Sequence, residues 1–228
     1  MSALDDRRRL EELYLPPADE FVLVDVPDLQ FVMIDGEGNP SGEAFAQASR
    51  WLFSVVYPIK RVAKERMGKI FVEPPLEGLW WADDMNDLIA GNRDKLKWRL
   101  MIVTADWVDE ELFVQAMAKA SERLGEPPRS LRRERFAEGT SVQIMHVGPN
   151  SEEVATIARL YHEFLPEHDL IPNGITTRST DGSEPRNARE AQDGATPASR
   201  TPGVGASASA AASRQWPVVG GLVPSANE

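Results

Sequence analysis

A strand, a glycine turn and a capped helix occur twice in this sequence, and this repeat constrains the fold more than any other feature. The first copy has its strand at 31–36 and the second at 141–148. Ser41 and Ser151 follow the turns, and each precedes an acidic stretch. A serine N-cap and acidic residues in the first turn stabilise the free amides of a helix start. Apolar residues then recur at helical spacing in both copies. The chain therefore begins each half with a strand followed by a helix.

Further elements are expected between and around the two copies. Pro27 is expected to end an opening strand near 21–26, because proline cannot donate to a strand ladder. The apolar run from Trp98 to Thr104 is typical of a β-strand. Gly125 is expected to end a helix that precedes it. The remaining expectations are strands near 69–73, 76–81 and 96–104, a short helix near 84–90 and a helix near 109–124. Together they predict an α+β domain with two-fold pseudo-symmetry.

The composition changes sharply near Gly174. Ala, Ser, Gly, Thr and Pro dominate the remainder, where Trp216 is the only aromatic residue. Such a segment buries too little apolar surface to offset the entropy lost on ordering. We therefore predict one domain over residues 1–173 and a disordered, low-complexity tail over 174–228.

Charge and composition exclude several classes of protein. The formal net charge is −11, so the chain is a poor nucleic-acid binder and suits cationic or neutral ligands. It has no cysteine and three histidines, which argues against a metal site and predicts no cofactor. No apolar run approaches the roughly 20 residues of a membrane helix, and the N-terminus lacks a secretory signal. A cytoplasmic location is the default expectation.

The most unusual stretch contains two adjacent tryptophans. Trp80 and Trp81 on a strand must point to opposite faces. Glu77 lies four residues before Trp81, so both project to one face of an unbroken strand. A carboxylate beside an aromatic wall suits a cationic or amphipathic ligand. The alternative is two packed core tryptophans and a solvated glutamate.

Other candidate residues carry weaker signals. Tyr57 ends an aromatic-rich helical segment, where a core tyrosine with a wet hydroxyl is the simpler interpretation. His146 on its strand is more simply a half-buried structural histidine. No Ser/His/Asp triad or metal-ligand spacing stands out.

Four strings from Leu13 to Asn173 resemble the GyrI-like domain proteins. They are L-Y-L-P-P-A-D-E-F-V-L-V-D-V-P, F-V-M-I-D-G-E-G-N-P, P-L-E-G-L-W-W-A-D-D-M and I-M-H-V-G-P-N-S-E-E. The resemblance implies two pseudo-symmetric β-α-β-β units around a central groove that binds small amphipathic or cationic molecules. A similar branch includes hydrolases that open the cyclopropane ring of DNA-alkylating compounds.

The resemblance also implies which residues line the groove. Tyr57, Glu77, Trp80 and Trp81 would contact the ligand. Glu77 would orient a ligand or a water molecule, and it is the candidate catalytic residue. The tryptophans would stack on a flat aromatic ligand.

The resemblance stops where the composition changes. The family pattern continues with H-H-E-I-Y and ends with a segment like E-K-L-R-T-V-L-R-Q-P-V, and this chain has neither. One set of codons for residues 181–200, read one base later, gives T-D-P-N-R-A-T-R-E-K-L-R-T-V-L-R-Q-P-V. Codons for 175–180 contain H-H-E-I-Y in another frame. We therefore predict that the tail is out-of-frame translation, that the last strands of the second unit are missing, and that activity is impaired.

Three hypotheses for function follow. The first is a binding module for small amphipathic, aromatic or cationic molecules. The second is a hydrolase that uses the same groove to detoxify cyclopropane-containing compounds. The third is a structural or interaction domain whose tryptophans belong to the core. The sequence makes no prediction of the oligomeric state.

Overall fold

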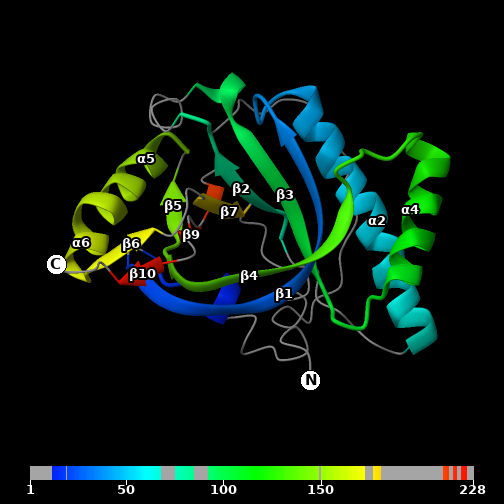
Figure 1. Cartoon of the computed structure of the whole chain (residues 1–228), viewed down its shortest axis with the longest axis horizontal. Coiled ribbons are helices and arrows are strands. Elements are labelled where there is room, and N and C mark those ends of the chain that lie inside the picture. The colour runs from blue at the N-terminus through cyan, green and yellow to red at the C-terminus, as the bar shows by residue number, and fades with distance from the viewer. Residues whose placement is uncertain are drawn as a thin grey trace, which may run out of the picture.

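The computed structural model arranges the chain as a closed antiparallel barrel with helices outside it (Figure 1). The sheet order is β1-β3-β2-β7-β9-β4. The described residues are 12–18, 20–67, 75–84, 92–148, 150–172, 177–180, 213–215, 218–219 and 222–224. The strand expected near 69–73 lies outside them, as does nearly all of the helix expected near 84–90.

Four strands form the main part of the barrel. They are β1 (Val22–Glu37), β2 (Glu77–Trp81), β3 (Lys97–Thr104) and β4 (Arg132–Gln143). β1 pairs with β3 through its second half and with β4 over most of its length, and β2 pairs with the other edge of β3. The strand expected near 96–104 is confirmed as β3.

The prediction that Pro27 ends the first strand is wrong. β1 continues through it, with the β4 ladder present on both sides of the proline, at Val26↔Gly139 and at Asp28↔Ala137. The ladder to β3 begins only at Gln30. One side of β1 is therefore unpaired at Pro27, and proline is tolerated at such edge positions.

Helices α2 (Glu43–Met67) and α4 (Glu110–Leu124) lie side by side on the outside of β1 and β3 (Figure 1). The helix expected near 109–124 is confirmed as α4, and the Asp109 carboxylate accepts a hydrogen bond from the Leu112 amide at 2.9 Å. The expected apolar stripe on α2 is confirmed by its buried residues, which include Ala48, Trp51, Leu52, Val55 and Ile59.

Gly36 provides the space in which Trp98 packs. The two residues are direct partners in the β1–β3 ladder, and Trp98 is fully buried. A Cβ atom on Gly36 would lie 2.2 Å from the Trp98 ring. Because a buried indole cannot move aside, only glycine fits at this position.

We expect Gly36→Ala to lower the free energy of unfolding by about 3 kcal/mol, the upper range for overpacking a core. Urea denaturation of the variant measures this loss. The control is the double variant with Trp98→Leu, in which the smaller side chain leaves room for the methyl group. If Gly36→Ala lowers the free energy of unfolding equally in the Trp98→Leu background, the clash with Trp98 is not the cause of the loss.

The second half of the chain repeats the strand-then-helix plan of the first. β4 leads through β5 (His146–Gly148) into α5 (Asn150–Arg159), a π-helical turn (Leu160–Phe164) and α6 (Leu165–Glu167). A second core cluster forms here from Val142, Leu160 and Leu165. The α+β class with two β-α-β-β units is thus confirmed: β1, α2, β2 and β3 form the first unit.

Two short strands close the second unit. β7 (Thr177–Thr180) has four residues and pairs with β2, and β9 (Val218–Val219) has two and pairs with β4 and β7. Two-stranded pairs outside the barrel join β6 (Leu170–Pro172) to β10 (Leu222–Pro224), and β5 to β8 (Ser213–Gln215). The four short strands β7, β8, β9 and β10 are the described residues within 174–228, and the disordered tail expected there stays a prediction.

Candidate ligand-binding site

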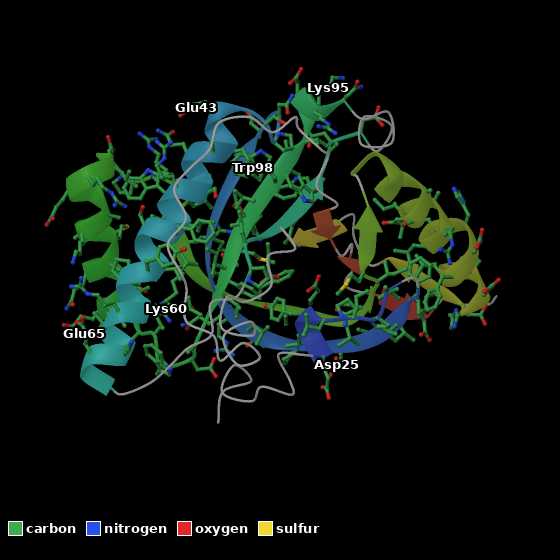
Figure 2. The ribbon with its side chains drawn as sticks, turned by 180° about the vertical axis from the view of Figure 1, so that it is seen from behind. Asp25, Glu43, Lys60, Glu65, Lys95 and Trp98 are labelled. Atoms are coloured by element: carbon green, nitrogen blue, oxygen red, sulfur yellow. The ribbon has the colours of Figure 1, made fainter. Side chains whose placement is uncertain are left out.

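Strand β2 presents Trp80 to the helices outside the barrel. The Trp80 ring stacks on Phe45 of α2, with 5.7 Å between centroids, and Phe45 also meets the edge of Trp98 at 5.3 Å. Figure 2 shows Trp98 beside α2. Gly78 lies two residues before Trp80 on the same face, and its lack of a side chain leaves room for the indole. Trp80 is thus part of the packing between the sheet and α2.

Glu77 and Trp81 lie on the opposite face of the same strand. The β2–β3 ladder is unbroken from Glu77 to Trp81, so alternation directs both side chains to the inside of the barrel. Trp81 is partly exposed, whereas Glu77 is completely buried. This agrees with the predicted division of the two tryptophans between faces.

The Glu77 carboxylate is held by a residue far away in the sequence. The Tyr14 hydroxyl donates a hydrogen bond to Glu77 Oε1 at 2.9 Å, and Tyr14 is itself 6% exposed. A carboxylate buried without water needs such donors, because burial of an unpaired charge is costly. The hydrogen bond therefore joins the segment that carries Tyr14 to the wall of the barrel at Glu77.

A charge cluster lies on the same inner face, near the end of β1. Arg99 Nε donates to Asp35 Oδ1 at 2.6 Å, and Arg132 Nη1 lies 3.0 Å from Asp35 Oδ2. Burial acts to raise the pKa of Asp35, but the hydrogen bonds and charges of the two arginines outweigh it and lower the pKa. Arg132 also pairs with Glu134. Asp35 thus stays ionised, and its charge is neutralised within the cluster.

Glu138 is a second buried carboxyl group. It lies on β4 and is only 6% exposed. Burial raises its pKa from the ordinary 4.5 to about 7. Its strand neighbours on the same face are Phe136 and Thr140, and Pro27 lies opposite. No sequence pattern pointed to this residue.

The raised pKa of Glu138 predicts a pH-dependent stability. Between pH 4.5 and about 7 the folded chain keeps a proton that the unfolded chain has lost, so stability falls as pH rises through this window. The free energy of unfolding should decrease by about 3 kcal/mol across this pH range. Urea denaturation at pH 5 and pH 8 should show the decrease, and Glu138→Gln should remove it. Glu122→Gln, which changes an exposed glutamate on α4, should leave it intact; an equal decrease in both variants would contradict the assignment.

Tyr57 does not join Glu77 and Trp81 on the inner face. It lies on α2, outside the barrel, where it is 47% exposed and stacks on Phe53 at 5.7 Å between centroids. The sheet therefore separates the four residues predicted to line one groove: Glu77 and Trp81 are inside, and Trp80 and Tyr57 are on the helix side.

Sequence reasoning missed Tyr14, Asp35 and Arg99. Arg99 could have been identified from the sequence, because it is a charged residue within an otherwise apolar strand. Tyr14 gave no comparable signal. Among the described residues no group of three His, Asp or Glu side chains is placed to hold a metal ion. No helix in the described part of the chain is long and apolar enough to cross a membrane.

Small-molecule sites in proteins are lined by aromatic side chains with a few polar groups, and the inside of a β-barrel is one of the places where they occur. The family model of the GyrI-like small molecule binding domain matches residues 19–180, and the chain belongs to this family. The function of that domain is to bind small molecules. No curated protein matches the sequence.

Solved structures from Listeria innocua share the fold. An uncharacterized conserved protein is 28% identical with a TM-score of 0.75, and the alignment covers 95% of this chain and 98% of that one. Two proteins described as hydrolases are 25% and 28% identical, with TM-scores of 0.69 and 0.68. Each of these alignments covers 94% of this chain and 98% of the other.

Proposed function

We propose that this chain binds small, flat, aromatic cations inside the barrel, with Glu77 as the charge partner and Trp81 as the stacking surface. The observation that carries the proposal is the buried Glu77 carboxylate on the same inner face as a partly exposed indole. In a dry environment a carboxylate attracts a cation strongly, and an indole face adds a cation–π contribution.

Charge further supports a cationic ligand. Asp35 lies on the same inner face at the end of β1, and its charge is neutralised by two arginines. The formal net charge of −11 also favours the approach of cations over anions.

Two ligands that differ by one methyl group and one charge test the proposal. N-methylphenanthridinium is a flat cation, and phenanthridine at pH 8 is its neutral counterpart. We expect the cation to bind at least about tenfold more tightly, measured by calorimetry and by tryptophan fluorescence. Equal affinities would refute a charge-selective site, and binding of neither compound would refute the aromatic site altogether.

A hydrolase that opens cyclopropane-containing alkylating compounds is the second candidate. The carboxylate and phenol 2.9 Å apart favour it, since such groups can exchange a proton with water. Two structures of similar fold are described as hydrolases. In this reaction Glu77 would accept a proton from a water molecule as its oxygen bonds to one ring carbon. One carbon–carbon bond of the cyclopropane breaks, its electron pair passes to the rest of the compound, and that part takes up the proton. Mass spectrometry of such a compound after incubation should reveal addition of one water; binding without this product would leave only the first function.

A further inference from the structure

The N-terminal segment, residues 12–18, is attached to the end of β4. Gln143 Nε2 donates to the Glu12 carbonyl at 2.8 Å, and the Met145 amide donates to the Pro17 carbonyl at 3.1 Å. Ala18 forms an isolated bridge with Met145. Gln143 is buried, with 3% of its surface exposed.

The same segment reaches β2 on the other side of the barrel. Leu13 and Tyr14 are buried in the main core, and Tyr14 contacts Glu77 of β2. β2 and β4 are not neighbours in the sheet, because β7 and β9 lie between them. Residues 12–18 therefore connect the two strands across the part of the barrel closed by its shortest strands.

The contact with Tyr14 fixes one oxygen of Glu77 in place. A hydrogen bond of 2.9 Å from a buried phenol restricts the rotation of the carboxylate that accepts it.

We propose that Tyr14 is a positioning residue of the ligand site, which holds the Glu77 carboxylate in the orientation that receives a cation. This inference rests on the proposed function. It makes the N-terminal segment a part of the binding site and not merely a support for the barrel.

The test is Tyr14→Phe in the full chain, which removes one hydroxyl and keeps the buried ring. We expect about a fivefold loss of affinity for N-methylphenanthridinium, the direction and size expected for one hydrogen bond to a charged group acting indirectly. Phenanthridine should bind unchanged. In a Glu77→Gln background the same substitution should change the cation affinity less than about twofold. Tyr161→Phe, which removes a hydroxyl in the second core region, is the control.

Infrared spectroscopy separates this inference from the proposed function. The carboxylate stretch of Glu77, identified by its loss in Glu77→Gln, should shift in Tyr14→Phe with no ligand present. A shifted band without cation binding would refute the proposed function and leave the contact standing. Cation binding with an unshifted band, or an equal loss of affinity in the Glu77→Gln background, would overturn the role of Tyr14.

Discussion

Glu77→Gln is expected to weaken the binding of N-methylphenanthridinium by at least about 30-fold, because truncating one partner of a buried charge pair costs 2 kcal/mol or more. The amide is nearly isosteric with the carboxylate and keeps an acceptor for the Tyr14 hydroxyl. The substitution therefore removes the charge with little change in packing. Calorimetric titration of the variant and of the unmodified chain measures the effect.

The neutral ligand and a distant charge provide the controls for this prediction. Phenanthridine should bind both proteins within about threefold, since it gains nothing from the charge. Glu122→Gln removes the same formal charge from the outer helix α4 and should leave both affinities unchanged. If Glu122→Gln loses as much cation affinity, the cause is the net charge of the protein. If Glu77→Gln binds the cation as tightly as the unmodified chain does, Glu77 is not part of the site.

The elements that depend on local sequence could be predicted. α4 follows from Asp109 as its cap and Gly125 at its end, and β3 follows from its apolar run. The opposite orientations of Trp80 and Trp81 follow from strand alternation alone. These features need only neighbours within a few residues, and the sequence displays those neighbours directly.

The contacts that define the site could not be predicted in this way. Tyr14 and Glu77 are 63 positions apart, and Arg99 and Asp35 are 64 apart. Both contacts depend on which strands pair and in which register, and composition and spacing do not determine either. The placement of Tyr57 shows the same limit, because helical spacing does not reveal which side of the sheet a helix covers.

The closing strands lead to the second large prediction. The barrel is completed by β7 with four residues and β9 with two, whereas β1 has sixteen. Short strands provide few ladder hydrogen bonds and little buried area, so this seam should be the weakest part of the barrel. We propose that the segment from 174 onward is read out of frame, and that the restored frame supplies longer closing strands with the sequences H-H-E-I-Y and L-R-T-V-L-R-Q-P-V.

A chain carrying the restored segment is expected to melt about 10 °C higher than the chain as printed. Several additional kilocalories of strand pairing and apolar burial account for a shift of this size in a domain of 150–250 residues. Differential scanning calorimetry of the two chains measures it, and N-methylphenanthridinium titration shows whether the site is also improved. A chain ending at residue 173 is the control, and it should melt at or below the printed chain.

DNA sequencing across codons 170 to 205 decides the origin of the segment independently of stability. An uninterrupted frame that encodes the printed residues would refute the reading-frame proposal. Equal melting of the printed and restored chains would show that β7 and β9 already close the barrel as well as longer strands do. A higher melting temperature together with tighter cation binding would instead show that the closing strands help to hold Glu77, because β7 pairs directly with β2 at Glu77↔Thr180.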